Sequence, residues 1–426
     1  MVNVMNEAVP SVVAIDIGTH KVSVLIGRIH APDQIEVIGM AHAPNRGMSK
    51  GIIRNLDKVV AAIKDAVAQA EDMADCRIHT AWVAIPSAEL KSFNASGRTP
   101  VMNQTITTTE IVRTLEMAKS SHLMPDHYLT NAVPLGVAID DQPEWVDHPI
   151  NMSGNFITGH YHLMMLPINT MQNLDKALKS AGIGVERTII STLATSEAVL
   201  LKDEKEYGVC MIDIGAGTTN IAVYLENRLI LSHTLQRGGE HVTRDIASVL
   251  QTSTEQAENL KIRYGCVDLS AIKPDQMIQI PGIGIAPGMI ISRIELADII
   301  VARYEEIFEE VRQQLEQSGA INVLRHGVVL TGDACQIEGA VALARRVLGV
   351  SAHLGNPPLA VDISEEKRPL LRRSIYATAS GLLMYSQNEQ QRASEVGVEE
   401  QSNDGWLQQY VVQPVQTILE KLRQLV

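Results

Sequence analysis

The stretch D-I-G-T-H-K, residues 16–21, joins two runs rich in β-branched residues, 12–17 and 22–29, as a tight turn joins two strands. The same device returns as D-I-G-A-G-T-T-N at residues 213–220. Aligning Asp16 with Asp213 also aligns the Ile-Gly pair that follows each aspartate. We therefore expect two related halves, each opening with a strand, a glycine-containing loop and a second strand.

Hydrophobic periodicity predicts the elements around these two repeats. Residues 56–71 have apolar side chains at helical spacing, and Asn55 is a suitable N-cap. Gly182 is placed to end a second helix. The expected helices are 56–71, 171–181, 193–202, 298–317 and 336–348, and further strands are expected at 81–85, 209–214, 221–225 and 327–331.

The chain has 426 residues, which is too long for one compact core, so several domains are expected. The segment after residue 86 is rich in Thr, His and Pro, which predicts an inserted subdomain. A Gly/Pro-rich turn at 281–288 predicts a second accessory unit. The expected units are a first half (1–86 and 167–202), an insertion (87–166), a second half (203–235 and 310–385), an accessory subdomain (236–309), a disordered linker (386–404) and a terminal helix (405–426).

The two loops have the chemistry of a nucleotide site. Backbone N–H groups of a glycine-containing turn bind phosphate, and Mg²⁺ prefers carboxylate oxygens, directly or through water. Asp16 and Asp213 supply one carboxylate at each strand end, and Lys21 supplies a positive charge. A single loop of this kind is more often a simple turn, but two equivalent loops in two halves are far more specific.

A third motif, L-T-G-D-A at residues 330–334, precedes a helix and offers a turn that can pack against an adenine ring. Together the three motifs resemble the phosphate and adenosine motifs of the actin, sugar-kinase and heat-shock chaperone superfamily. Within it, the chain is similar to the FtsA family of cell division proteins. That similarity covers nearly the whole chain and includes N-R-G-M-S-K-G at 45–51, A-E-D-M-A at 70–74, L-K-I-R-Y-G at 260–265 and A-C-Q-I-E-G at 334–339.

The resemblance implies an α/β, actin-like fold of two ribonuclease-H-like halves with a cleft between them. It implies ATP and Mg²⁺ as ligands, with Asp16 and Asp213 ordering the metal's shell through water. Asp333 departs from the family pattern, which usually has a second glycine there. The implied nucleotide contacts are Asp16, Gly18, Thr19, Lys21, Asp213, Gly215, Gly217, Thr218, Gly238, Gly239, Glu258, Lys261, Gly332 and Asp333.

In actin-like folds the group that orients the attacking water comes from the segment joining the halves. Thr195, Ser196 and Glu197 are available there, and Ser196 and Glu197 are the catalytic candidates. The structural alternative is a helix N-terminus with Ser or Thr capping and Glu favouring the dipole. We expect slow ATP turnover or none.

The C-terminal segment predicts a membrane contact. After a linker poor in large apolar residues, apolar side chains recur at steps of three and four, which predicts an amphipathic helix that binds a bilayer surface. Packing on the protein itself or on a partner helix is the alternative, and Pro414 is a possible first helical residue. The membrane-facing candidates are Trp406, Leu407, Tyr410, Val411, Val415, Ile418, Leu419, Leu422 and Leu425.

Composition excludes several other classes. The net charge of -13 disfavours nucleic-acid partners, and the four cysteines form no CxxC pair. No signal peptide is recognisable at the N-terminus, so a cytoplasmic location is expected. His160 and His162 share a strand face, but a structural role is favoured over a metal site.

The resemblance implies a cell-division scaffold on the cytoplasmic face of the inner membrane at the division site. It would polymerise into actin-like filaments and bind the C-terminal tail of FtsZ through residues 236–309. The insertion at 87–166 would contact neighbouring protomers and later division proteins. A pilus-assembly adaptor and a small-molecule kinase of the same superfamily are the alternatives.

Overall fold

The computed structural model describes residues 11–396, except 32–33, 123, 143, 274, 281–287, 358–360 and 363–373. The terminal helix predicted at 405–426 and the linker residues 397–404 lie outside the described part. No helix within the described part is both long enough and apolar enough to span a bilayer.

The first half is built on a six-stranded sheet. Its strands β1, β2 and β3 are antiparallel neighbours, and β6 and β10 continue from β1 in parallel. A short strand, β18, is parallel to the outer edge of β3, so residues 361–362 belong to the first sheet and not, as predicted for 310–385, to the second half. In sheet order the strands are β10 (Gly184–Ile190), β6 (Thr80–Ile85), β1 (Ser11–Ile17), β2 (Lys21–Ala31), β3 (Gln34–Pro44) and β18 (Val361–Asp362).

The second half repeats this pattern in a five-stranded sheet. Three antiparallel strands, β13, β12 and β11, are followed by two parallel ones, β16 and β17. The equivalence of the halves that the two aspartate motifs predict is therefore present in the strand order. The strands are β13 (Arg228–Leu235), β12 (Thr219–Leu225), β11 (Val209–Ile214), β16 (Val328–Thr331) and β17 (Ala352–Leu354).

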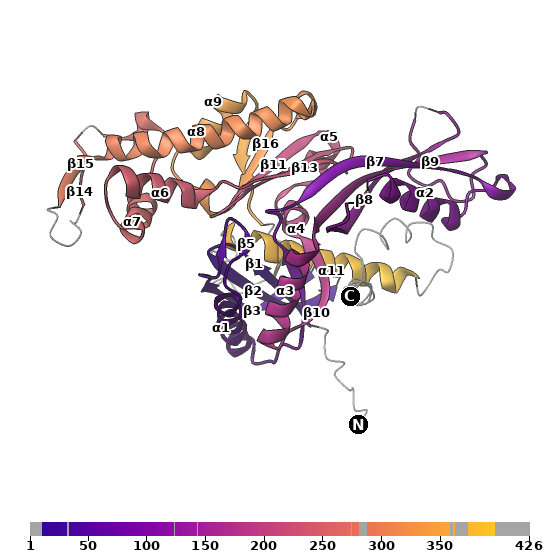
Figure 1. Cartoon of the computed structure of the whole chain (residues 1–426), viewed down its shortest axis with the longest axis horizontal. Coiled ribbons are helices and arrows are strands. Elements are labelled where there is room, and N and C mark those ends of the chain that lie inside the picture. Colours follow the sequence, from indigo (N-terminus) through magenta and orange to yellow (C-terminus); the bar gives the residue numbers. More distant parts are fainter. Residues whose placement is uncertain are drawn as a thin grey trace.

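Helices separate and cover the two sheets (Figure 1). Alternate residues of β1 face opposite sides: Val12 and Ala14 join the core between the sheets, and Val13 and Ile15 join the core under the outer helices. The central core is shared by the inner faces of both sheets. Helices α1 (Leu56–Ala74) and α3 (Ile168–Ala181) cover the first sheet, α4 (Ser191–Val199) and α11 (Ala377–Val396) lie between the sheets, and α6 (Gly239–Val249), α8 (Arg293–Gln317) and α9 (Ala340–Leu348) cover the second.

Several helix ends follow from local sequence. Asn55 caps α1 by accepting a hydrogen bond from the Lys58 amide at 3.0 Å, as predicted. Gly182 ends α3 with a φ of 85°, which glycine adopts without strain. The helix predicted at 193–202 is two helices, because α4 ends at Val199 and α5 (Lys202–Tyr207) begins a new turn.

The linker was predicted to start at residue 386, but α11 continues to Val396. Ser386 and Gln387 are buried, and the Ser386 hydroxyl donates to the carbonyl of Leu383 at 2.7 Å. Their polar composition indicated solvent exposure, whereas packing of α11 draws both side chains into the interior. The helix predicted from residue 336 begins later, at Ala340, because η4 (Asp333–Gln336) forms a separate 3₁₀ turn.

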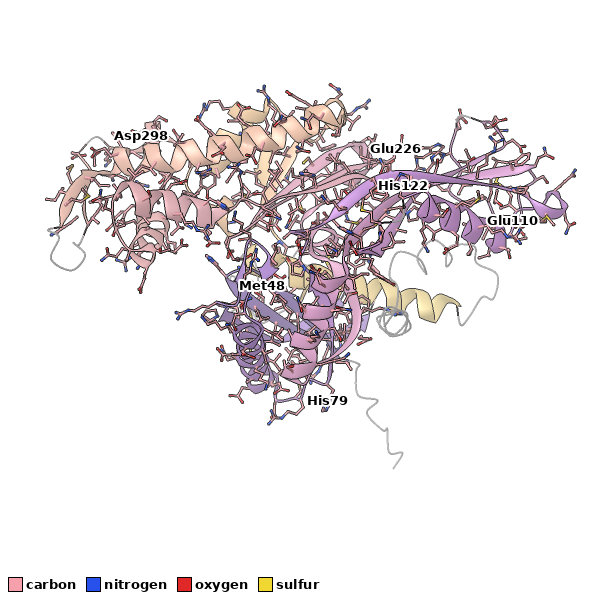
Figure 2. All side chains as sticks on the ribbon, viewed as in Figure 1. Met48, His79, Glu110, His122, Glu226 and Asp298 are labelled. Carbon is pink, nitrogen blue, oxygen red and sulfur yellow. The ribbon has the colours of Figure 1, made fainter. Side chains whose placement is uncertain are left out.

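The segment predicted as an insertion forms its own three-stranded sheet with one helix. Glu110 caps that helix by accepting a hydrogen bond from the Thr107 amide at 2.9 Å, and Figure 2 labels Glu110 on it. His122 lies near the helix end and stacks on Phe93, with ring centroids 4.6 Å apart. The elements are β7 (Lys91–Pro100), β9 (Phe156–Pro167), β8 (His127–Ile139) and α2 (Thr108–Ser120).

The inserted subdomain lies beside β13, the edge strand of the second half (Figure 1). Ser92 donates its hydroxyl to the carbonyl of Ser232 at 2.5 Å, and the Asn94 amide donates to the carbonyl of Ile230 at 3.1 Å. His162 joins both sides, with one ring nitrogen 2.6 Å from Asn94 Oδ1 and the other 2.8 Å from Ser232 Oγ. His162 is therefore a structural histidine, as predicted. His160 stacks on Trp145.

This junction predicts an acid-sensitive fold. Burial lowers the pKa of His162 to about 4, whereas the unfolded chain keeps an ordinary value near 6.5. Unfolding therefore takes up a proton between these values, and the free energy of unfolding falls as pH falls, by up to about 3 kcal/mol. Chemical denaturation at pH 7 and pH 4.5 should show a steeper loss for the natural chain than for His162→Gln. Equal losses would show that His162 does not contribute.

The accessory subdomain extends from the opposite end of the second half (Figure 1). It contains α6, α7 (Thr254–Tyr264), the hairpin β14 (Met277–Ile280) and β15 (Met289–Ser292), and the first turns of α8. Ser292 and Glu295 form a capping box at the start of α8, and Asp298, labelled in Figure 2, is exposed on that helix. Smaller elements are β4 (Met48–Ser49), β5 (Ile52–Ile53), η1 (Met102–Gln104), η2 (Leu269–Ala271), η3 (Ala320–Val323) and η5 (Ser374–Tyr376).

Candidate nucleotide site

The two predicted phosphate loops have the same turn. The Gly18 amide donates to the carbonyl of Lys21 at 2.9 Å, and the Gly215 amide donates to the carbonyl of Thr218 at 2.9 Å. Each loop follows the first strand of its half, so the shared strand order brings them to equivalent places. The structure thus supplies two matched turns, and tight glycine-containing turns of this kind can bind phosphate oxygens through their remaining backbone N–H groups.

A cavity of ≈ 300 Å³ lies where the loops meet. Its volume is at the lower end of the range found for small-molecule sites. Two predicted contacts, Gly217 and Gly238, do not line it but support the loops, since a Cβ on Gly238 would lie 2.5 Å from the carbonyl oxygen of Gly215. The predicted residues that line it are Asp16, Gly18, Thr19, Lys21, Asp213, Gly215, Thr218, Gly239, Glu258, Lys261, Gly332 and Asp333.

Two half-buried carboxylates from different halves, those of Asp16 and Asp213, line this cavity. Burial, with a further contribution from the other carboxylates, raises the pKa of Asp16 to about 7. Burial also raises the pKa of Asp213 to about 6, although a hydrogen bond from the Asn220 amide, 3.2 Å from Asp213 Oδ2, acts in the opposite direction. A bound cation would favour the charged form of both side chains.

The donor set fits Mg²⁺ bound together with phosphate. Among the described residues, no three His, Cys, Asp or Glu side chains form a metal cage. Mg²⁺ commonly uses only one or two carboxylates and completes its shell with waters and substrate phosphates. Asp16 and Asp213 would hold such an ion, and the ion would neutralise charge on the phosphates. The cavity lining includes five carboxylates and two lysines, so an anionic ligand needs this neutralisation.

Lys261 is positioned at the start of α6 by a compact network. Its ammonium group donates to the Gly239 carbonyl at 3.0 Å, to Thr243 Oγ1 at 2.8 Å and to Glu258 Oε2 at 2.7 Å. The first amides of α6 attach the helix to the second loop, since the Gly239 amide donates to the Gly215 carbonyl at 2.9 Å and the Glu240 amide donates to the Ala216 carbonyl at 2.8 Å. Three predicted residues of the accessory subdomain, Gly239, Glu258 and Lys261, therefore line the same cavity as the two loops.

Asp333 contacts the first half rather than an open adenine surface. Its carboxylate pairs with the Lys21 ammonium, and its other oxygen accepts a hydrogen bond from the Ser374 hydroxyl at 3.0 Å. Gly332 before it has a φ of 86°, and a Cβ there would lie 2.4 Å from Asp213 Oδ1. Glycine is therefore required at 332, and Asp333 is held next to the phosphate loops.

The catalytic candidates lie away from the cavity. The Ser196 hydroxyl is buried and donates to the carbonyl of Thr192 at 2.8 Å, and Glu197 pairs with Lys205 at 2.6 Å. Thr195 bonds Thr378 at 2.9 Å. The prediction of a water-orienting role for Ser196 and Glu197 is not supported, because their polar groups are used inside the helix layer.

Other polar residues of the cavity were missed from sequence. Ser87 follows β6 and donates to Asn220 Oδ1 at 2.7 Å, and Asn220 in turn orients Asp213. Asn220 stands inside the quoted second motif, and Ser87 and Ser191 follow the carboxyl ends of parallel strands, where α/β ligands commonly bind. The place of Asn220 in the motif, and of Ser87 and Ser191 after parallel strands, could have identified these residues from the sequence. Ser374 carries no such signal.

Comparison with known proteins decides the family. The family model described as "Cell division protein FtsA" matches residues 210–381, and that described as "SHS2 domain inserted in FTSA" matches residues 87–165. The FtsA of Pseudomonas aeruginosa is 34% identical over 415 residues, which are 97% of this chain and 97% of that protein. The chain belongs to the FtsA family of cell division proteins. The FtsA of Escherichia coli K12 is also 34% identical, over 88% of this chain and 90% of its own length.

Solved structures confirm the predicted fold class. The PilM–PilN type IV pilus biogenesis complex matches with a TM-score of 0.65 and 16% identity, covering 88% of this chain and 98% of that one. MreB5 of Spiroplasma citri bound to ADP matches with a TM-score of 0.54 and 13% identity, covering 90% and 98%. At these identities the likeness shows the fold alone, and this member of the FtsA family has an actin-like fold.

Proposed function

We propose that this member of the FtsA family binds ATP with Mg²⁺ in the cleft between its halves. The observation that carries the proposal is the meeting of two matched loops, each with a half-buried carboxylate, at one cavity. MreB5, which shares the fold, has been solved with ADP and with AMPPNP. We expect turnover to be slow or absent, since neither of the two candidates for orienting the attacking water, Ser196 and Glu197, lines the cavity.

The protein acts as a scaffold that polymerises into actin-like filaments and ties FtsZ to the cytoplasmic membrane at the division site, where it recruits later division proteins. Membership of the FtsA family favours this role over a pilus-assembly adaptor or a small-molecule kinase. The FtsZ tail docks on the accessory subdomain, which exposes large apolar side chains: Ile262 is 71% exposed, Ile290 66% and Met277 61%. The inserted subdomain serves protomer contacts.

The terminal segment anchors the scaffold to the bilayer surface. Its sequence places large apolar residues at helical steps, and half-burial of seven or eight of them would supply roughly 5 to 12 kcal/mol before ordering costs. Lys421 and Arg423 add attraction to anionic lipid.

Removing this segment should abolish vesicle binding. We expect the whole chain to co-sediment with anionic vesicles in ATP and Mg²⁺, and to carry FtsZ into the pellet. A chain that ends at Asp404 should stay in the supernatant with FtsZ, because the apolar stripe is gone. The measurement is the pelleted fraction of each protein.

Point variants separate the apolar stripe from the rest of the segment. Leu419→Glu should reduce pelleting as truncation does, and Gln416→Glu, which lies between the apolar positions, should not. If the whole chain fails to pellet, the terminal segment is a protein-binding element and membrane tethering is wrong. If the chain pellets but FtsZ does not, the proposed partner is wrong.

A further inference from the structure

The nucleotide cleft contains an ion pair that joins its two walls. Lys21 begins β2 in the first half, directly after the first phosphate loop, and its ammonium group pairs with the Asp333 carboxylate in the second half. The second Asp333 oxygen accepts a hydrogen bond from Ser374, at the start of η5. η5 is itself attached to β2, since the Ser23 hydroxyl lies 3.3 Å from the carbonyl of Ile375. Asp333 therefore contacts β2 directly through one oxygen and contacts η5, which is attached to β2, through the other.

Lys21 is also one of the two lysines that line the cavity, so its ammonium group is available to a phosphate there. Lys261, the other lysine lining the cavity, already donates to Gly239, Thr243 and Glu258. Asp333 thus neutralises the ammonium group of Lys21 while adding a carboxylate to the same space as Asp16 and Asp213. A phosphate that enters the cavity must displace Asp333 from the Lys21 ammonium group, and it then lies close to the displaced Asp333 carboxylate. The phosphate and the carboxylate are both negatively charged and repel each other.

We propose that the Asp333 carboxylate competes with nucleotide phosphate for the Lys21 ammonium, so that Asp333 sets the affinity of the cleft for ATP. The inference rests on the proposed ATP binding. The competition can be reversed by a ligand because the pair is partly hydrated: the side chain of Lys21 is 23% exposed and that of Asp333 is 53% exposed. Without nucleotide the pair joins the two walls of the cavity, and with nucleotide the phosphate takes the place of Asp333 beside Lys21.

Calorimetric titration of ATP, ADP and adenosine, each with Mg²⁺, tests this competition in the full-length chain. Asp333→Asn keeps the size of the side chain and an oxygen for Ser374 but removes the charge. We expect Asp333→Asn to bind ATP about tenfold more tightly. Adenosine affinity should stay within about twofold, because adenosine has no phosphate to bring to Lys21.

Two controls separate competition from a general effect of charge. In a Lys21→Met background, Asp333→Asn should change ATP affinity less than about threefold, since there is no cation to compete for. Glu240→Gln removes a carboxylate from the same cavity, but Glu240 pairs with Arg244 rather than Lys21, so its effect should also stay below about threefold.

The outcomes that overturn the inference are distinct. Weaker ATP binding by Asp333→Asn would make Asp333 a ligand of the metal or nucleotide. An equal gain in ATP affinity in the Lys21→Met background, or with Glu240→Gln, would show that any carboxylate in the cavity repels the phosphates. An equal gain in adenosine affinity would mean that Asp333 acts on the adenine base or the ribose. If neither the natural chain nor any variant binds ATP, the proposed ATP binding itself is wrong.

Discussion

Gly381→Ala is expected to destabilise the protein by about 3 to 5 kcal/mol, enough to leave much of the chain insoluble. A Cβ on Gly381 would lie 1.7 Å from the carbonyl oxygen of Ala194 and 2.5 Å from its carbonyl carbon. These are backbone atoms of α4, so no side-chain rotation can relieve the contact. The two helices between the sheets must move apart, and both sheets pack against them.

Helix propensity alone predicts the opposite sign. Alanine is more favourable than glycine inside a helix by about 1 kcal/mol, so an uncrowded Gly381→Ala would stabilise α11. The steric contact outweighs this gain in helix propensity because it forces α4 and α11 apart at the point where the two buried helices cross. The measurement is the midpoint and slope of chemical denaturation, together with the soluble yield.

Gly184→Ala is the matched control. Gly184 lies in β10 with a negative φ, and a Cβ there would meet neighbours at 3.2 Å, so we expect a change within about 1 kcal/mol. If Gly381→Ala is as stable as the natural chain, the crossing of α4 and α11 is looser than the structure shows.

Gly217→Ala should weaken ATP–Mg²⁺ binding by about tenfold to a hundredfold while leaving most of the stability intact. A Cβ on Gly217 would lie 2.7 Å from Thr19 Oγ1 and 2.9 Å from the Cα of Lys50, both in the first half. Thr19 Oγ1 also accepts a hydrogen bond from the Gly51 amide at 3.0 Å. The added methyl group would push the loops apart, so that one of them loses a charge-assisted hydrogen bond to phosphate, worth about 1.5 to 3 kcal/mol.

Isothermal titration calorimetry with ATP and Mg²⁺ measures this loss, and denaturation in the absence of nucleotide shows whether the fold is retained. Thr218→Ser lies in the same loop and keeps its hydroxyl, so its affinity should stay within about threefold of the natural chain. Unchanged affinity in Gly217→Ala would mean that the two loops do not bind one ligand together.

Repetition made the framework predictable from sequence. Each D-I-G loop follows a strand that has apolar side chains on both of its faces, as expected for a sheet that is covered on both faces. Because both halves carry the same pattern, the strands predicted in one half support those predicted in the other. Asn55 and Gly182 fixed helix ends because capping depends on only a few neighbouring residues.

The features that sequence did not predict depend on contacts distant in the chain. Ser386 is polar but buried, because α11 packs between two sheets. The place of Ser196 in a connecting segment predicts a role at the cavity, but its hydroxyl bonds the Thr192 carbonyl within α4 and Ser196 does not line the cavity. The pairing of Asp333 with Lys21 joins residues 312 positions apart, and no local pattern reports it.

The seam between the inserted subdomain and β13 also bears on the order in which the chain is synthesised. Residues 91–167 leave the ribosome before residues 228–235, the strand on which they dock. Hydrogen bonds cross this interface from Ser92, Asn94 and His162. Water can bond to the same polar groups until β13 has been synthesised. Met164 and Val133 of the insertion belong to the same hydrophobic cluster as Leu229 of β13, so the apolar part of this interface stays uncovered until β13 has been synthesised.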